Sequence, residues 1–209
     1  MVKILIADDH TIVREGLRQI LLDSGLSDID EAGKADEIIN KVRNNSYDLI
    51  LLDISMPGRS GLDVLKQIRC EGFDMPILIL TMHPEGQYAI RALRAGASGY
   101  LTKESAPDEL IAAIKKVSRG GKYISQSLAE EIAYALDDTS DRPLHTVLSD
   151  REYQVLCMIA SGKTLTHISD YLALSVKTIS TYRSRVLNKM RMQNNAELTH
   201  YAIKNGLVE

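Results

Sequence analysis

Short apolar runs alternate with amphipathic patterns along residues 1–122. The apolar runs that predict strands are Val2–Ala7, Ile29–Ala32, Asp48–Leu52, Ile77–Leu80 and Gly99–Leu101. Between them apolar residues recur at spacings of three and four, as in Leu62, Leu65 and Ile68, which predicts helices. Strands that alternate with helices predict a parallel sheet with helices on both faces, an α/β doubly wound fold.

The pattern changes after residue 122. The stretch Ser127-Leu128-Ala129-Glu130 has the form of a capping box and predicts a short helix to about Leu136, followed by an exposed linker up to Pro143. From Leu148 onward only helical periodicity remains. We therefore expect a first domain over 1–122, a linker with a short helix over 123–147, and a small all-α domain over 148–209.

Composition places the chain among ordinary globular proteins. It has 209 residues, of which 44% are hydrophobic and 25% charged, and this excludes a mostly disordered or collagen-like chain. No apolar run approaches the ~18 residues of a transmembrane helix, and the first run is too short for a signal peptide. The two cysteines, Cys70 and Cys157, lack metal-ligand spacing. We expect a cytoplasmic protein with no membrane association.

Charge is distributed unevenly along the chain. Residues 1–124 carry 16 Lys and Arg against 18 Asp and Glu, residues 125–147 carry 1 against 5, and residues 148–209 carry 8 against 5. The net charges of these segments are −2, −4 and +3, within a total of −3. This distribution suggests an acidic site, an acidic linker and a basic binding unit.

Acidic residues follow two of the predicted strands. Asp8 and Asp9 follow the first strand and Asp53 the third, while Thr81 and Lys103 follow the fourth and fifth. With strand order 2-1-3-4-5, the three acids meet in the crevice at the carboxyl ends of strands one and three. Their mutual repulsion calls for a cation, for which Mg²⁺ is the natural candidate. The plainer alternative is that Asp8 and Asp9 only cap the helix that follows.

This pattern resembles the receiver domain of two-component response regulators over about residues 1–122. The stretches that carry the resemblance are Ile4–His10, Leu52–Gly58, Leu80-Thr81 and Gly99–Lys103. The resemblance implies that Asp53 accepts a phosphoryl group from a sensor histidine kinase. It also implies that Asp9, Asp53 and the main-chain carbonyl of Ser55 ligate Mg²⁺, with Asp8 acting largely through water.

The resemblance further implies that Thr81 hydrogen-bonds the phosphoryl group, that Lys103 pairs with its charge, and that Tyr100 is a switch aromatic. The alternative interpretation is that Tyr100 is simply a half-buried tyrosine of the strand, with no role in a switch. Glu104 follows Lys103 where many receivers have proline, so the geometry of that loop is left open. His10 and His83 flank the site, and we expect them to have surface or loop-packing roles.

The stretch after Ser175 predicts a helix with two unlike faces. Ser175 is a suitable N-cap. Val176, Ile179, Val186 and Met190 share one face at ~100° per residue, and polar residues occupy the other. Basic and short polar side chains on such a face suit contacts to DNA phosphates and base edges. Taken alone, such a face is more simply a solvated basic surface. Beside the family resemblance of the flanking stretches, the residues expected to contact DNA are Lys177, Ser180, Thr181, Ser184, Arg185, Asn188 and Lys189.

Residues 148–209 resemble the helix-turn-helix output domain of the LuxR type (NarL/FixJ subfamily). The resemblance rests on stretches such as Leu148–Glu152, Gly162–Thr164 and Lys177–Tyr182. It implies dimerisation through the last helix, about Ala196 to Lys204. Arg183 points toward the apolar side, and we expect it to pair with a carboxylate of the scaffold, Glu152 being the candidate.

Together these observations favour a phosphorylation-dependent, DNA-binding transcriptional regulator, a homodimer when active, and not an enzyme. Three alternatives stay open. A phosphatase or phosphotransferase would use an Asp nucleophile, although no second Asp stands two positions after Asp53. A nucleotide-binding fold would need glycines after the first strand, where Asp8-Asp9-His10 stands. The third alternative is an output domain that binds RNA, and only the match to the helix-turn-helix motif favours DNA over RNA.

Overall fold

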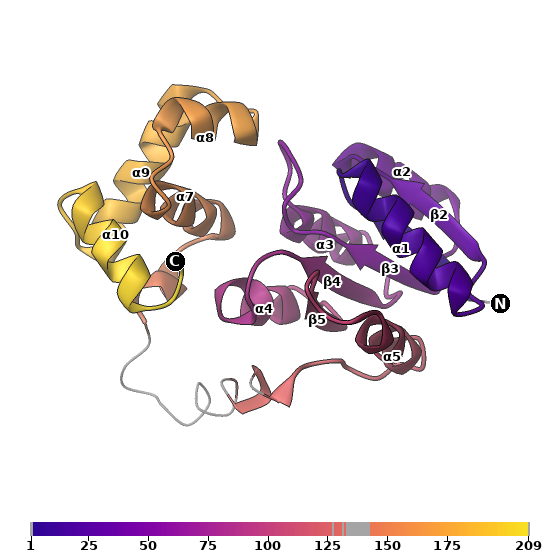
Figure 1. Ribbon diagram of the computed structural model, residues 1–209. Coiled ribbons are helices and arrows are strands. Elements are labelled where there is room, and N and C mark those ends of the chain that lie inside the picture. Colours follow the sequence, from indigo (N-terminus) through magenta and orange to yellow (C-terminus); the bar gives the residue numbers. More distant parts are fainter. Residues whose placement is uncertain (1, 127, 131, 133–142, 209) are drawn as a thin grey trace. The chain divides into compact units, whose positions relative to one another are not determined.

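The structure, a computed structural model, describes residues 2–126, 128–130, 132 and 143–208. The chain forms two compact units, Met1–Ala129 and Glu130–Glu209 (Figure 1). The short helix expected over 127–136 and the linker after it fall mainly outside the described residues, and the domain boundaries at 122 and 147 stay predictions. Within the described ranges, no helix is both long and apolar enough to span a bilayer.

The first unit is built on a parallel sheet with strand order β2-β1-β3-β4-β5. Its strands are β1 (Lys3–Ala7), β2 (Asp28–Ala32), β3 (Leu49–Leu52), β4 (Ile77–Thr81) and β5 (Gly99–Thr102). The register sets Ala7 beside both Ala32 and Leu52, so β1 and β3 end at the same edge. The parallel pairing and the strand order confirm the predicted doubly wound sheet of order 2-1-3-4-5.

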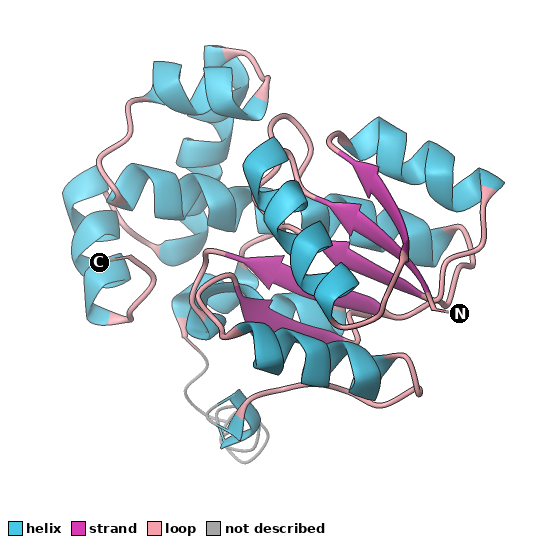
Figure 2. Ribbon diagram, turned by 45° about the vertical axis from the view of Figure 1, so that its right-hand side comes forward, coloured by secondary structure: helices cyan, strands magenta, loops and turns pink. Residues whose placement is uncertain are grey.

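Helices cover both faces of this sheet (Figure 2). Because side chains alternate along a strand, Ile4 and Ile6 of β1 face one side, where they share a core with α1 (Thr11–Asp23) and α5 (Pro107–Val117). Leu5 faces the other side and is also fully buried. The remaining helices of the unit are α2 (Ala35–Asn44), α3 (Gly61–Cys70) and α4 (Glu85–Arg94). A core on both faces holds the strand ends rigidly.

The loop after β3 packs tightly against the start of α3. Ser60 caps this helix by accepting a hydrogen bond from the Asp63 main-chain N–H. The Gly61 N–H donates to the Ile54 carbonyl at 3.0 Å, and a Cβ at Gly61 would lie only 1.9 Å from the Asp53 carbonyl oxygen. Only glycine fits there, so the close packing of α3 fixes the backbone of Asp53.

The second unit is helical throughout its described part. After a 3₁₀ turn (Leu144–Val147) come α7 (Asp150–Ala160), α8 (Leu165–Leu172), α9 (Val176–Met190) and α10 (Asn195–Lys204). Each of these four α-helices begins with a side-chain cap, including the predicted cap Ser175, which accepts from the Thr178 N–H. Ala173 ends α8 in the left-handed region, with φ of 51°, and turns the chain into α9.

Candidate functional site

The carboxyl ends of β1 and β3 bring three acids together. The Asp53 N–H donates to the Ala7 carbonyl at 2.9 Å, which ties the end of β3 to the end of β1. Ligand atoms of Asp8, Asp9, His10 and Asp53 all lie within 4.8 Å of one another. The predicted convergence of the three acids is therefore present. His10 occupies the N-cap of α1 and its own side chain makes no capping hydrogen bond, but Asp8 Oδ1 accepts from the His10 N–H at 2.9 Å. Asp8 therefore contacts the start of α1 as well as belonging to the cluster.

Lys103, after β5, reaches into this cluster. Its Nζ lies 2.6 Å from Asp8 Oδ2 and 2.7 Å from Asp53 Oδ2. Burial alone would lower the pKa of Lys103, but the charge and hydrogen bonds of Asp53 and Asp8 raise the pKa above its ordinary value. The loop begins with the Lys103 N–H donating to the Thr81 carbonyl at 2.8 Å, and the peptide bond to Glu104 is trans.

One ammonium does not balance three carboxylates. The pKa of Asp9 is raised, first by burial and further by the charges of Asp8 and Asp53, although His10 opposes the rise. Asp9 Oδ1 is buried and accepts no hydrogen bond from the described residues, and His10 Nδ1 lies 3.0 Å from it. An excess of acidic oxygens with an unsatisfied buried atom fits a hard divalent cation such as Mg²⁺.

Thr81 is the last residue of β4, the strand next to β3, and Tyr100 lies within β5. Both are fully buried, so Tyr100 is not the half-buried residue of the alternative interpretation. The Tyr100 hydroxyl donates to the His83 carbonyl at 2.9 Å, and burial raises the pKa of that hydroxyl. Tyr100 is thus bonded directly to the segment that follows Thr81, which is the connection a switch would need.

A contact between Ser55 and His83 was not visible in the sequence. Ser55 Oγ and His83 Nε2 lie 2.9 Å apart, and His83 Nδ1 lies 3.2 Å from Gln87 Oε1. The ring also packs against Tyr88, with centroids 4.7 Å apart. Burial lowers the pKa of His83. The histidine joins the loop after β3 to the start of α4, a loop-packing role of the kind expected.

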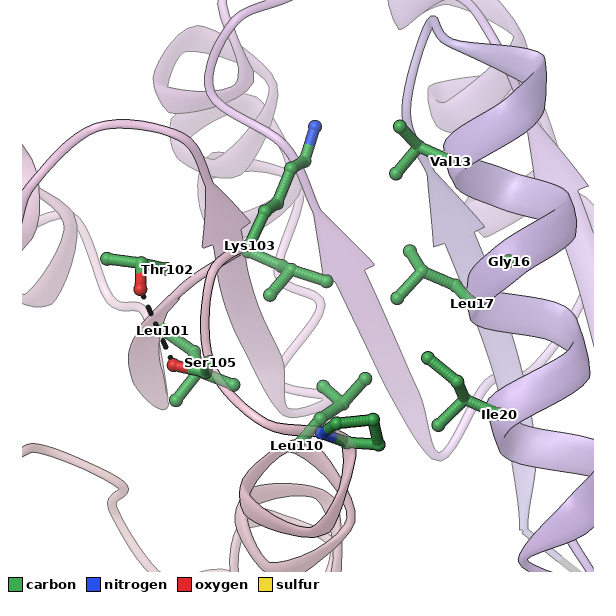
Figure 3. Close-up of a pocket in the computed structure, with 11 residues that line it drawn as sticks. Val13, Gly16, Leu17, Ile20, Leu101, Thr102, Lys103, Ser105 and Leu110 are labelled. Atoms are coloured by element: carbon green, nitrogen blue, oxygen red, sulfur yellow. Dashed lines mark hydrogen bonds between the residues drawn. The ribbon is translucent and has the colours of Figure 1, made fainter.

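An apolar pocket of about 180 Å³ lies between α1 and the loop from β5 to α5. Val13, Leu17 and Ile20 of α1 point into it from one side (Figure 3). Leu101 and Leu110 face them, and Lys103 turns its amine away from these apolar groups (Figure 3). The stem of Lys103 therefore has apolar surroundings while its ammonium reaches the acids.

In the second unit, α9 presents the expected polar stripe. The exposed residues of this stripe are Lys177, Ser180, Thr181, Ser184, Arg185, Asn188 and Lys189. On the opposite face Ile179, Val186 and Met190 are buried as predicted. Val176 was expected among them and is 45% exposed instead, because it is the first residue of the helix and extends past the core.

The predicted pairing of Arg183 with Glu152 is wrong. Lys189 Nζ lies 2.7 Å from Glu152 Oε2, whereas Arg183 Nε donates to Asn195 Oδ1 at the start of α10. The N-terminal turn of α7 meets the last turn of α9, so Lys189 rather than Arg183 comes within reach of Glu152. Lys189 therefore holds the scaffold together in addition to being exposed on the stripe.

Comparisons with known proteins agree with both units. The family model described as the response regulator receiver domain matches residues 4–115, and that for bacterial regulatory proteins of the luxR family matches residues 146–202. Response regulator UvrY of Escherichia coli (strain K12) is 37% identical over 209 residues, covering 99% of this chain and 96% of UvrY. Response regulator GacA of Pseudomonas protegens is 35% identical, covering 100% and 99%.

Solved structures extend this similarity to the fold. The RcsB–DNA complex is similar with a TM-score of 0.59 at 26% identity, covering 97% of this chain and 98% of RcsB. RcsB of Salmonella enterica serovar Typhimurium, bound to promoter rprA with the phosphomimetic BeF₃⁻, has a TM-score of 0.67 at 26% identity, covering 96% and 97%. The chain therefore belongs to the two-component response regulators that join a receiver domain to a LuxR-family helix-turn-helix domain.

Proposed function

We propose that this response regulator is switched by phosphorylation of Asp53 and controls transcription by binding double-stranded DNA through α9. The observation that supports this best is the position of Lys103, whose ammonium lies 2.7 Å from Asp53 Oδ2. A nucleophilic carboxylate beside a fixed cation, in a cluster that still carries excess negative charge, suits phosphoryl transfer. Cytoplasmic location is part of the proposal, since the DNA partner is there.

Phosphoryl transfer depends chiefly on positioning and on neutralising charge. A carboxylate nucleophile, unlike a hydroxyl, has no proton to lose before it attacks and so needs no general base. A bond forms between an Asp53 oxygen and phosphorus while the bond to the imidazole nitrogen of a histidine kinase breaks. Asp8, Asp9, Asp53 and the Ser55 carbonyl would hold Mg²⁺, which supplies further charge neutralisation when bound. Lys103 then pairs with the phosphoryl charge.

The phosphorylated state is read by the neighbouring buried residues. Thr81 would hydrogen-bond the phosphoryl oxygens, and this would move the segment whose His83 carbonyl accepts from Tyr100. A complete change from 1:99 to 99:1 between two receiver states needs about 5.5 kcal/mol of differential stabilisation. We propose that the changed receiver favours a homodimer, in which two α9 helices read a two-fold-related DNA site.

The test uses the full chain with acetyl phosphate and Mg²⁺. The expected result is a single phosphoryl adduct by intact mass and tighter binding to duplex DNA. Asp53→Asn is expected to abolish both effects, and Asp23→Asn, a matched change at the exposed end of α1, to preserve them. Labelling or a DNA response in Asp53→Asn would refute the proposal. Many turnovers on a phosphate ester would favour a phosphatase, and preference for RNA over duplex DNA would favour an RNA-binding output.

A further inference from the structure

The middle of the polar stripe on α9 consists of hydroxyl side chains. Ser180, Thr181 and Ser184 are exposed there, between Lys177 and Asn188. Two of the three hydroxyls are turned back onto their own helix. Thr181 Oγ1 donates to the Lys177 carbonyl and Ser184 Oγ donates to the Ser180 carbonyl, both at 3.0 Å.

These bonds limit what the two residues can offer to DNA. A hydroxyl has one hydrogen to donate, and here it goes to the preceding turn of the helix. What Thr181 and Ser184 still present are acceptor lone pairs and, in Thr181, a methyl group. Ser180 differs, because its hydroxyl makes no hydrogen bond with the part of the chain that the structure describes.

The major groove distinguishes base pairs by the groups they expose. Guanine shows two acceptors, N7 and O6, so it has nothing to donate to an acceptor-only side chain. Thymine exposes a 5-methyl group, and adenine exposes an amino donor. Cytosine also exposes an amino donor, so an acceptor alone fits adenine and cytosine alike. The methyl group of Thr181 is what singles out thymine.

We propose that Thr181 is a specificity residue that selects a thymine in each half-site. The selection comes from contact between the Thr181 methyl group and the thymine 5-methyl group. This inference rests on the proposed DNA-binding function. Lys177 and Arg185 flank Thr181 on the stripe and are placed to contact phosphates. Thr181 then supplies sequence information, while the neighbouring cations supply affinity that is largely independent of sequence.

The experiment uses the full chain treated with acetyl phosphate and Mg²⁺. A random duplex library first yields the preferred sequence, and each thymine in it is then replaced by uracil, which lacks only the 5-methyl group. We expect one thymine per half-site whose replacement weakens binding by about fourfold, the ratio expected for one buried methyl group. Thr181→Ser is expected to bind the thymine and uracil duplexes equally, and Thr181→Val to keep the preference for thymine.

Thr178→Ser is the matched control. It removes the same methyl group from a half-buried residue in the first turn of α9, whose hydroxyl lies 2.8 Å from Ser175 Oγ. This variant is expected to discriminate thymine from uracil as the parent does. Equal binding of all thymine and uracil duplexes by the parent overturns the inference, as does discrimination that survives in Thr181→Ser. After either outcome, binding to selected duplexes would still support the proposed function. If the protein bound no duplex at all, the proposed function would be overturned together with this inference.

Discussion

Glu152 and Lys189 form an ion pair that joins the first turn of α7 to the last turn of α9, with 2.7 Å between Oε2 and Nζ. The carboxylate is almost completely buried and the ammonium is 43% exposed. Glu152 Oε2 also accepts from the Ser149 N–H at 2.8 Å and completes the capping box of α7. One carboxylate thus caps one helix and anchors the helix proposed to enter DNA.

Glu152→Gln is expected to lower the free energy of unfolding by about 1 kcal/mol, because the amide can still cap α7 but no longer pairs with a charge. Glu152→Ala is expected to cost about 2 kcal/mol, since the cap is lost as well. Urea unfolding measures both, with Lys163→Ala, a change at an exposed position of the same unit, as the control. A larger loss in the control would contradict the assigned pairing.

The same pair predicts a pH dependence of stability. Burial would raise the pKa of Glu152, but the hydrogen bonds from Lys189 and Ser149 lower it below the ordinary value of 4.5. A group with a lowered folded-state pKa stabilises the protein above its unfolded-state pKa and loses that contribution as pH falls through the folded-state value. Unfolding is measured between about pH 6 and 3, a range that includes the ordinary pKa of a glutamate. As pH falls through this range, Glu152→Gln is expected to lose less stability than the parent.

Gly61→Ala is expected to reduce stability by about 2 kcal/mol or more and to slow labelling by acetyl phosphate. The added Cβ would clash with the Asp53 carbonyl at 1.9 Å and displace the backbone of the proposed phosphoacceptor. Gly16→Ala, in α1, is the matched control, because nothing lies within 4 Å of a Cβ there. That control is expected to be neutral or to stabilise by about 0.5–1 kcal/mol. Equal behaviour of the two variants would argue against the close approach.

Lys103→Met is expected to slow labelling of Asp53 by about 100-fold, because a fixed cation beside the reacting group is lost. Without Mg²⁺ it is expected to lose about 3 kcal/mol of stability, since Asp8 and Asp53 become an unpaired buried couple. Adding Mg²⁺ is expected to restore part of this loss. Lys115→Met, at an exposed site on α5, provides the comparison. Stability that does not respond to Mg²⁺ in Lys103→Met would contradict a shared cation site.

DNA affinity is expected to fall steeply with salt. A dimer that neutralises ~6 phosphates gives a slope of log affinity against log salt near −5. Arg185→Ala is expected to make the slope shallower by about 2, one phosphate contact for each subunit, with little change in the preferred sequence. Lys34→Ala, an exposed change in the receiver unit, is expected to leave the slope unchanged. A flat response in the parent would exclude phosphate contacts.

The strand ends were the most predictable part of the site. Apolar runs located β1 and β3 closely, and parallel pairing carries residues after such strands to one edge, so the meeting of Asp8 with Asp53 follows from topology. Lys103 was predictable for the same reason. The buried and exposed faces of α9 followed from helical periodicity, except at Val176, where the helix begins.

Contacts between side chains of different elements could not be predicted in this way. The partner of Glu152 depends on where along α9 the first turn of α7 packs. Lys189, which pairs with Glu152, is six residues after Arg183, and periodicity alone does not choose between these two positions. The Ser55–His83 contact depends on side-chain rotamers in two loops. Periodicity assigns faces to elements, but pairing across them is decided by the three-dimensional packing.

The hydrogen bond from the Asp53 N–H to the Ala7 carbonyl ties the acid cluster to the core sheet, so the cluster exists only where the sheet is folded. Any ion or phosphoryl mimic that occupies the cluster only in the folded state must therefore raise the melting temperature of the receiver unit by mass action. At a ligand concentration 100 times its dissociation constant the gain is about 2.7 kcal/mol. Thermal denaturation alone can thus rank divalent cations and phosphate mimics without any activity assay.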